Sequence, residues 1–269
     1  MPELPEVEVT RRGIAPRIVA HTISAVVVRE PRLRWRITDA VRKLAGRVVR
    51  SVGRRGKYLL IDCGDGHLIV HLGMSGSLRF VAPDAQPGPH DHVDIVLGER
   101  VLRLRDPRRF GAILWTPGDA SAHPLLARLG VEPLSREFSG ARLHAITRAH
   151  RNAIKMLVMD AHHVVGVGNI YASESLSRAR IHPATRASRL SLARCERLVQ
   201  AIKATLNAAI RAGGSSLRDF AGAQGEHGCF QQRYRVYGRA GLPCRECGAR
   251  IRRVVQGQRS TYYCPRCQR

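Results

Sequence analysis

The sequence has few acidic residues and no long apolar run, and each absence excludes a class of protein. Asp and Glu together number only 21 of the 269 residues, against 45 Lys and Arg, so the formal net charge is +24. No stretch of about 18 apolar residues occurs, so the sequence predicts no membrane-spanning helix. The first residues, MPELPE, are acidic and rich in proline, unlike a secretory signal peptide.

The excess of positive charge predicts a polyanionic partner. Nucleic acid is the expected one, with ribosomal RNA or an anionic membrane surface as the alternatives. Most of the basic residues are arginine, whose planar guanidinium contacts phosphate with two parallel hydrogen bonds. A hydrophobic content of 44% is sufficient for a core, and the chain length predicts about two domains plus a small module.

The seven cysteines divide into a set of four and three isolated residues. Cys63, Cys195 and Cys229 are odd in number and far apart, which indicates reduced thiols in a cytosol. The other four have the spacing C-x₂-C-x₁₆-C-x₂-C near the end of the chain, which predicts a zinc site because two thiolate pairs on tight turns meet at one tetrahedral ion. These predicted zinc ligands are Cys244, Cys247, Cys264 and Cys267.

Hydrophobic periodicity divides the chain into a β-rich part and a helical part. Residues 5–20 have a helical pattern, and the short β-rich runs that follow predict a β-sandwich, with a Pro/Gly-rich loop at 82–90. The pattern becomes helical from about residue 121, and Gly-rich residues 213–232 predict a mobile loop before the cysteine-rich end. The expected strands are 23–29, 47–53, 57–63, 67–72, 93–98, 101–105 and 111–115, and the expected helices are 122–129, 139–150, 153–160, 169–179 and 191–211.

Pro2 and Glu3 form a candidate catalytic pair. Removal of the initiator methionine would leave Pro2 with a secondary amine whose pKa lies near neutrality. Attack of that amine on a sugar aldehyde carbon gives an iminium with a fixed positive charge, which favours proton loss at the neighbouring carbon. Glu3 would move the protons. The alternatives are an ordinary terminal residue and a carboxylate at a helix N-terminus.

Lys57 and two turns are further candidates. Lys57 belongs to the stretch 54–58, where one predicted strand ends and the next begins. It is a candidate second amine that donates to a phosphate or a leaving group, or simply one more basic residue. The turn at 71–77 carries Met74, and the turn at 106–111 carries Arg108 and Phe110. Apolar wedges and an arginine at loop tips are what fills the hole left by an everted base, although Met74 and Phe110 are also typical core residues.

Two more patterns indicate contacts with phosphates. Gly166 and Gly168 precede a predicted helix that starts near Asn169, which is typical of an anion cradle but lacks the dinucleotide-binding fingerprint. The histidine pair at 90 and 92 has no third metal ligand at a sensible spacing, so we expect solvent or phosphate contacts there. The sequence between the predicted zinc ligands contains several arginines and two tyrosines, which predicts a hairpin that enters a DNA groove. The alternative is a zinc site that only stabilises the fold.

Together these residues resemble the formamidopyrimidine-DNA glycosylases, bacterial repair enzymes that act on oxidised purines. The matching segments run nearly from end to end in the order of that family and include the four-cysteine finger. The others are PELPEVE (2–8), RRGKYLL (54–60), HLGMSGSLR (71–79), HDHVD (90–94), DPRRFG (106–111), AIK (153–155), VVGVGNIYASE (164–174) and VYGR (236–239).

The resemblance implies an α+β multidomain fold. It implies an N-terminal β-sandwich catalytic domain at 1–120, a helix–two-turn–helix domain with a base-capping loop at 121–232, and a C-terminal zinc finger at 233–269 that holds one structural Zn²⁺. Double-stranded DNA with oxidised bases or abasic sites would bind in the cleft between them. A monomer in the bacterial cytoplasm, associated with the nucleoid, is expected.

The resemblance also implies residue roles. Pro2 would be the nucleophile at the sugar C1′, Glu3 the acid/base residue, Lys57 the proton donor in β-elimination and Arg259 the donor in δ-elimination. Met74, Arg108 and Phe110 would fill the void left by the flipped base. The residues expected to hold phosphates are His90, His150, Arg151, Lys155 and Asn169.

Two departures and two alternatives stay open. His150 stands where many relatives have Lys, and Cys229 stands where Tyr is common, which affects one phosphate contact and the base-capping loop. The sister class that acts on oxidised pyrimidines, the endonuclease VIII-like enzymes, has Gly where Leu4 stands and lacks the void-filling set. A non-catalytic zinc-dependent DNA-binding protein would need the charge and the finger but neither Pro2 nor Glu3.

Overall fold

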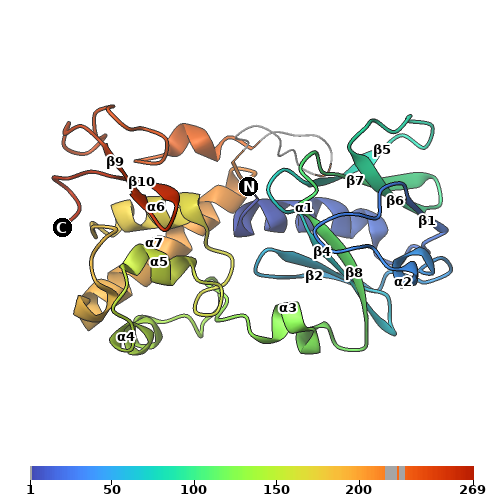
Figure 1. Cartoon of the computed structure of the whole chain (residues 1–269), viewed down its shortest axis with the longest axis horizontal. Coiled ribbons are helices and arrows are strands. Elements are labelled where there is room, and N and C mark those ends of the chain that lie inside the picture. Colours follow the sequence, from blue (N-terminus) through green and yellow to red (C-terminus); the bar gives the residue numbers. More distant parts are fainter. Residues whose placement is uncertain (1, 216–222, 224–227) are drawn as a thin grey trace. The chain divides into compact units, whose positions relative to one another are not determined.

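The computed structural model describes residues 2–215, 223 and 228–269, which form two compact units (Figure 1). The N-terminal unit comprises residues 1–127 and 212–229, and the C-terminal unit comprises 128–211 and 230–269. Most of the loop expected at 213–232 therefore lies outside the described residues. No helix within the described residues is long and apolar enough to cross a membrane.

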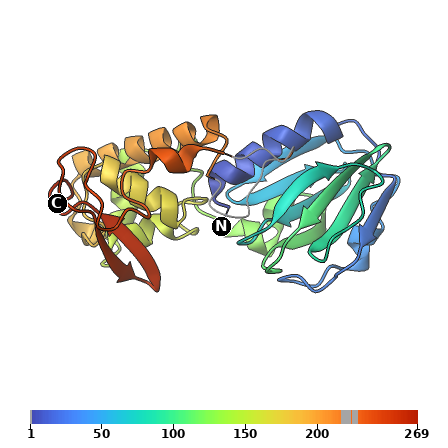
Figure 2. The same cartoon turned by 90° about the horizontal axis from the view of Figure 1, so that it is seen from above.

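Helix α1 (Leu4–Ile18) opens the N-terminal unit, close to the expected bounds of 5–20. Glu3 is its N-cap residue and forms a capping box with Glu6, which satisfies backbone N–H groups that the first turn leaves without helical partners. The helix ends at Ile18 because Val19 has an extended backbone. The buried side of α1 packs against strand β2 (Ser51–Arg55), as Figure 2 shows.

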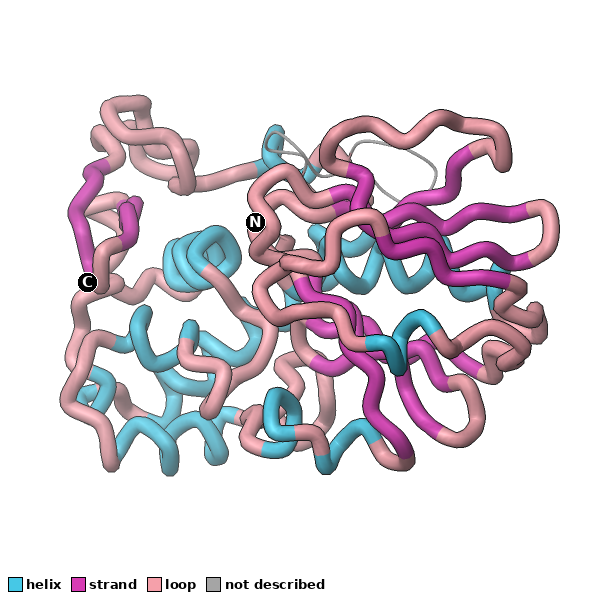
Figure 3. The backbone as a smooth tube through the Cα atoms, turned by 45° about the vertical axis from the view of Figure 1, so that its right-hand side comes forward, coloured by secondary structure: helices cyan, strands magenta, loops and turns pink. Residues whose placement is uncertain are grey.

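The strands of the N-terminal unit form two antiparallel four-stranded sheets, drawn in magenta in Figure 3. The core contains apolar side chains of both sheets and of α1, among them Ile14, Leu59 and Leu104. The unit is therefore the expected β-sandwich. One sheet has the order β1 (Ala25–Val28), β6 (Asp91–Leu97), β7 (Arg100–Arg105) and β5 (Ser77–Val81), and the other β2 (Ser51–Arg55), β3 (Tyr58–Asp62), β4 (Gly66–His71) and β8 (Ala112–Pro117).

Two strands differ from their expected positions. Strand β5 was not expected, because its five residues follow directly on the Gly-rich turn 71–77 and carry Arg79 in their middle. The run expected at 47–53 forms β2 only from Ser51, since Val48 instead makes an isolated bridge with Thr22. Short helices α2 (Asp39–Arg42), η1 (Ala120–Ala122) and α3 (Pro124–Ala127) complete the unit.

The C-terminal unit is helical and ends in a hairpin. Its longest helix, α7 (Leu192–Arg211), begins where Ser191 Oγ accepts a hydrogen bond from the backbone N–H of Arg194 at 3.4 Å. Helices α6 (Asn169–Arg178) and α7 pack side by side (Figure 2). The remaining helices are α4 (Gly140–Arg148), α5 (Ile154–Met159), α6 (Asn169–Arg178), η2 (Ala187–Arg189) and η3 (Phe230–Arg233).

The hairpin is formed by β9 (Arg252–Gln256) and β10 (Arg259–Tyr263), which packs against α6. Gly257 and Gln258, the two residues between the strands, both have a positive φ, at 52° and 60°. A two-residue turn of this kind matches the right-handed twist of the strands and fixes their register, which pairs Arg259 with Gln256.

Candidate functional site

The first site residues lie at the start of α1. Pro2 and Glu3 are both buried, and the backbone N–H of Glu3 donates to Glu6 Oε2 at 2.8 Å. The other carboxylate oxygen of Glu6 accepts from the backbone N–H of Ser215 at 2.8 Å. Glu3 therefore lies at the N-terminus of a helix, as the structural alternative for this residue expected. Glu6 connects the start of α1 to the beginning of the segment 213–232.

A buried ion pair connects α1 to the turn that carries Lys57. Glu8 Oε2 lies 3.2 Å from Arg54 Nε, and the Arg54 guanidinium also donates to the carbonyl of Gly56 at 2.8 Å. Burial raises the pKa of Glu8, but hydrogen bonds from Arg11 and Arg12 outweigh it and lower the pKa to about 2. The Glu8 carboxylate is thus ionised at neutral pH and holds the β2–β3 turn beside α1.

His71 lies opposite Tyr58 across the β3–β4 pair, with ring centroids 4.8 Å apart. Burial, together with the nearby positive charges of Lys57 and Arg34, lowers the pKa of His71 to about 4. The imidazole is therefore neutral at neutral pH, and its Nδ1 accepts a hydrogen bond from the backbone N–H of Gly73 at 3.0 Å. This bond fixes the first residues of the Met74 turn.

The carboxylate of Asp106 holds both predicted wedge turns together. Asp106 is completely buried, and it accepts from Ser75 Oγ at 2.8 Å and from the backbone N–H of Gly111 at 2.7 Å. Ser75 Oγ in turn accepts from the backbone N–H of Arg108 at 3.3 Å. A Cβ at Gly73, whose φ is +64°, would lie 2.4 Å from the backbone N of Gly111, so the two turns touch where no side chain fits.

The side chains on these turns point outward. Met74 is 40% exposed and Phe110 is 44% exposed, so the alternative that placed them in the core is wrong. The guanidinium of Arg108 lies 4.8 Å from the ring centroid of Phe110, close enough for a cation–π contact. Apolar groups held by a rigid base but exposed at the tip have the properties expected of wedges.

His90 lies at the edge of the same region. Its backbone carbonyl accepts from the N–H of Asp106 at 3.0 Å, and buried His92 contacts the carbonyl of Asp106 through Nε2 at 2.8 Å. The His90 side chain is half-buried. Hence the histidine pair is part of the framework around Asp106 rather than a metal site.

The described ends of the segment 213–232 lie close together. Ser215 and Cys229 form an isolated antiparallel bridge, and the backbone N–H of Cys229 donates to the carbonyl of Ala212 at 3.0 Å. The Cys229 side chain is exposed. The rest of the predicted base-capping loop, except Ala223, lies outside the described residues.

In the C-terminal unit, Lys155 is completely buried. Its ammonium donates to Asn169 Oδ1 at 2.5 Å and to Thr261 Oγ1 at 2.6 Å, and Asn169 Nδ2 donates to the carbonyl of Ser260 at 2.9 Å. Gly168 is the N-cap residue of α6, as the anion-cradle pattern predicts. These contacts join the starts of α5 and α6 to β10.

The other predicted DNA contacts of this unit are more accessible. Arg259 is exposed at the first position of β10, and Arg151 is exposed just after α4. His150 is half-buried, with its ring centroid 4.4 Å from that of His163. A Cβ at Gly257 would lie 2.4 Å from Met156 Cε, so the hairpin turn rests on the side chain of α5 next to Lys155.

The four predicted zinc ligands converge. Their sulfur atoms all lie within 4.8 Å of one another, with Cys244 Sγ 3.9 Å from Cys267 Sγ and Cys247 Sγ 3.5 Å from Cys264 Sγ. A tetrahedral site with Zn–S bonds of about 2.3 Å places its sulfurs about 3.8 Å apart. The backbone N–H of Cys267 points at Cys264 Sγ, 3.4 Å away, as expected for a thiolate ligand. The donor set therefore fits zinc.

Glu174 connects the finger to α6. Its buried carboxylate accepts hydrogen bonds from three successive backbone N–H groups, those of Arg235, Val236 and Tyr237, at 2.8–3.0 Å. The ring of Tyr237 then packs on Tyr262 of β10, with centroids 5.1 Å apart. One carboxylate thus fixes the start of the finger to the helix that begins at Asn169.

Comparison with known protein families assigns the chain along almost its whole length. Residues 1–113 match the formamidopyrimidine-DNA glycosylase N-terminal domain, 129–221 match the H2TH domain of the same enzymes, and 241–269 match the zinc finger found in FPG and IleRS. The chain belongs to the formamidopyrimidine-DNA glycosylase family. Each of the three matched ranges lies inside one of the domains expected from the sequence.

Curated members of the family are similar over their full length. The formamidopyrimidine-DNA glycosylase of Aromatoleum aromaticum is 59% identical over 270 residues, and that of Bordetella pertussis is 59% identical over 274 residues. In both comparisons, 100% of this chain and 100% of the relative are covered.

Solved structures of the family have the same fold. The MutM (Fpg) protein of Thermus thermophilus is 40% identical with a TM-score of 0.89, covering 99% of this chain and 98% of that one. Lactococcus lactis Fpg in complex with abasic-site DNA is 34% identical with a TM-score of 0.92, covering 99% of each chain. A MutM complex with DNA containing carbocyclic 8-oxo-G is 34% identical with a TM-score of 0.91, covering 100% of each.

Sequence reasoning did not identify the residues that hold the site together. Asp106 was seen only as part of a turn, and the contacts of Glu6 and Glu174 join segments 209 and 61–63 residues apart. Carboxylates are scarce in this chain, so an acidic residue next to a candidate motif was the one sequence signal that could have indicated these structural contacts.

We expect Asp106→Ala to lower the free energy of unfolding by about 2–4 kcal/mol, since it leaves the Gly111 N–H and the Ser75 hydroxyl buried without their acceptor. Urea denaturation would measure the change. Ser75→Ala removes one of these two bonds together with the 3.3 Å bond from the Arg108 N–H, but it leaves the Gly111 N–H its acceptor. It is therefore the control, with a smaller expected loss of about 1–2 kcal/mol. Equal losses in the two variants would contradict the role of Asp106 as the common acceptor.

The lowered pKa of His71 predicts a pH dependence of stability. Between pH 6.5 and about 4 the unfolded chain binds a proton at His71 that the folded chain does not, so stability falls as the pH falls through this window. We expect the wild type to lose about 1–2 kcal/mol more than His71→Asn between pH 7 and pH 5. Asn keeps an acceptor near Gly73 but does not titrate, so parallel pH profiles in urea denaturation would refute the assignment.

Proposed function

We propose that this protein is a DNA-repair glycosylase and abasic-site lyase that removes oxidised purines, such as 8-oxoguanine and formamidopyrimidines, from double-stranded DNA. The observation that carries the proposal is the similarity along the entire chain to formamidopyrimidine-DNA glycosylases, with Pro2 and Glu3 at the start of α1. The complexes of similar proteins contain abasic-site DNA and 8-oxo-G DNA, in agreement with this substrate.

The proposed chemistry begins at Pro2 after removal of the initiator methionine. Its secondary amine attacks the sugar C1′, the N-glycosidic bond breaks, and the base leaves with a proton. Glu3 protonates the ring oxygen O4′, the sugar ring opens, and an iminium joins Pro2 to C1′. Ionised Glu8 and Arg54 act indirectly, by holding the Lys57 turn beside the helix that presents Pro2.

The iminium then allows strand cleavage. Loss of a proton from C2′ expels the 3′ phosphate by β-elimination, and a second elimination expels the 5′ phosphate. We assign Lys57 as the proton donor of the first step and Arg259 as the donor of the second. Both side chains carry positive charge at neutral pH, which suits a group that assists a departing phosphate.

The remaining predicted residues hold DNA. Exposed Met74 and Phe110, with Arg108 stacked on the ring, would fill the space of the everted base. Asn169, at the start of α6 and above buried Lys155, would bind a phosphate at the helix N-terminus. His90, His150 and Arg151 are proposed as further phosphate contacts.

We assign one structural Zn²⁺ to the four cysteines, which would fix the β9–β10 hairpin that carries Arg259. The domain bounds proposed for the activity are those of the sequence: a catalytic β-sandwich at 1–120, a helix–two-turn–helix domain at 121–232 and a finger at 233–269. We place the enzyme in the bacterial cytoplasm with the nucleoid, where its substrate is.

Endonuclease VIII-like activity on oxidised pyrimidines is the second candidate. The exposed set Met74, Arg108 and Phe110, and Leu4 next to Glu3, favour the purine-specific class. Excision of 8-oxoguanine from duplex DNA should therefore exceed excision of thymine glycol by at least about tenfold in single-turnover kcat/KM, or about 1.4 kcal/mol. The reverse order would assign the chain to the sister class.

Reduction with borohydride tests the covalent step. The iminium should be trapped as a stable protein–DNA adduct, and Pro2→Gly should form much less of it. Glu3→Gln should lower base removal from 8-oxoguanine DNA by about 10²–10⁴-fold, because a proton donor is lost, yet still form the adduct on a preformed abasic site. A correctly processed wild type that forms no adduct would leave only the non-catalytic DNA-binding alternative.

Removal of one cysteine ligand should release the metal. We expect one zinc per chain by elemental analysis of the wild type and of Cys229→Ala, and less than half of that in Cys264→Ala, with DNA affinity lost in parallel. The comparison is matched because each variant removes a single thiol. Full zinc content in Cys264→Ala would show that the four sulfurs do not form the site.

A further inference from the structure

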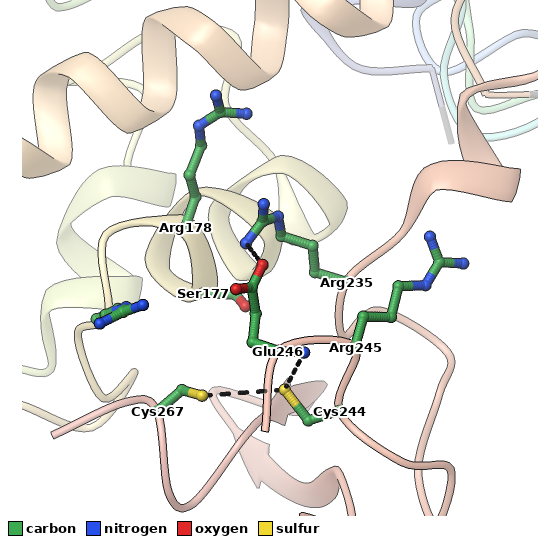
Figure 4. Close-up of a pocket in the computed structure, with 8 residues that line it drawn as sticks. Ser177, Arg178, Arg235, Cys244, Arg245, Glu246 and Cys267 are labelled. Carbon is green, nitrogen blue, oxygen red and sulfur yellow. Dashed lines mark hydrogen bonds and ion pairs between the residues drawn. The ribbon is translucent and has the colours of Figure 1, made fainter. Parts of the chain in front are cut away.

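A hollow lined mainly by arginine lies at the base of the zinc finger, within the C-terminal unit (Figure 4). It shares Arg180, Glu246 and Cys267 with a second hollow next to it, so the two form one groove, which we call the arginine groove. Six arginines and one acidic side chain, that of Glu246, line it. The six are Arg178, Arg180, Arg235, Arg245, Arg266 and Arg269.

Several of these charges are available to a ligand. Glu246 neutralises only Arg235, whose Nη1 lies 3.0 Å from its carboxylate. The guanidinium groups of Arg178 and Arg180 are exposed and make no hydrogen bond or ion pair with another residue of the described part of the chain. In Figure 4, no link joins Arg178 to another residue drawn, and the guanidinium of Arg245 makes one hydrogen bond, from Nη2 to the carbonyl of Gln232 at 3.0 Å.

Within the C-terminal unit, the groove lies away from Asn169 and Arg259, two of the residues assigned to the repair reaction. Asn169 is the first residue of α6 and Arg178 is the last, so about 14 Å of helix separates them. Along β10, Arg259 at the turn is about 17 Å from Cys264 at the metal end of the hairpin. Both elements place the groove at the opposite end from the proposed phosphate and elimination residues.

The chemistry of the walls identifies the ligand. A planar guanidinium group can bind two phosphate oxygens at once. Because the six arginines are distributed over two joined hollows, they fit a chain of phosphates better than a single phosphate. Protein partners generally insert aromatic or aliphatic anchors, but the side chains that line the hollow of Figure 4 are those of arginine, cysteine, serine and glutamate.

We propose that the arginine groove is a second DNA-binding site, which binds the phosphate backbone of another duplex segment without reading its sequence. A protein that holds two segments at once passes directly from one to the other, which shortens the search for a damaged base. This role does not depend on the chemistry assigned to Pro2.

The test measures transfer between undamaged duplexes, so its outcome is independent of base removal. Full-length zinc-loaded protein is bound to a fluorescent duplex, and its dissociation rate is followed as unlabelled duplex is added. The wild-type rate should rise with competitor concentration, because the incoming duplex binds before the first one leaves. The triple variant Arg178→Ser, Arg180→Ser, Arg245→Ser should dissociate at a rate that is independent of competitor.

The matched control removes the same charge elsewhere in the unit. Arg128→Ser, Arg136→Ser and Arg142→Ser, all exposed and outside the groove, should retain the concentration dependence. Arginine-to-lysine changes at the three groove positions should restore part of it. A further measurement is the affinity of a preformed complex for a second duplex at several salt concentrations. The slope of log affinity against log salt should be less steep by about 2.7 in the serine variant than in the wild type.

Three results would overturn the proposal. The first is a wild-type rate independent of competitor, and the second is a serine variant that transfers like the wild type. The third is unchanged DNA transfer in a serine variant that has lost binding to a polyglutamate peptide, which would assign the groove to an acidic protein partner. Zinc content and circular dichroism verify that the variant is folded, and excision of 8-oxoguanine tests the proposed function separately.

Discussion

The buried carboxylate that accepts backbone N–H groups is the interaction on which this structure depends. Asp106 joins two turns, Glu6 joins the first turn of α1 to Ser215, and Glu174 joins α6 to the start of the finger. Each carboxylate holds a segment that has little secondary structure of its own: the Ser75 and Gly111 turns, Ser215, and the residues at 235–237. A buried carboxylate acceptor contributes strongly because its removal leaves a buried N–H group without a partner, which costs free energy.

This use of carboxylates also explains the surface. The chain has only 21 acidic residues, and several are buried in contacts with backbone or arginine, among them Glu6, Glu8, Asp94 and Glu174. These acidic groups are therefore withdrawn from the exterior, where most arginines lie. The small number of acidic residues and their burial therefore contribute both to the attraction of the surface to DNA phosphates and to the rigidity of the site.

The parts that the sequence predicted correctly are those with a local pattern. Helix α7 has a repeating apolar face and a serine cap, and the four cysteines have the spacing of a zinc site and converge as that spacing predicts. Strand β5 was missed because its signal is short and follows a Gly-rich turn. The family resemblance supplied roles for Pro2, Glu3 and Lys57, but the residues alone left the structural alternatives open.

Lys155 shows why the rest was out of reach. A lysine in a basic protein is expected at the surface, but here α5 and β10 enclose it between Asn169 and Thr261, which are 14 and 106 residues away. Only the packing of α5, α6 and β10 against one another brings its ammonium into contact with Asn169. Likewise, Met74 and Phe110 are exposed because two turns approach each other closely, and the hydrophobic periodicity of the sequence does not predict this approach.

The half-exposed position of two cysteine ligands has a consequence for the life of the protein. Cys247 and Cys267 are partly accessible, whereas Cys244 and Cys264 are buried. Peroxide and related oxidants, which produce the damaged purines, also attack accessible sulfur. Loss of one ligand would loosen the hairpin and with it the grip on the strand. The repair capacity of a cell would then decline under the very stress that increases the number of lesions, unless thiol reductants protect the finger.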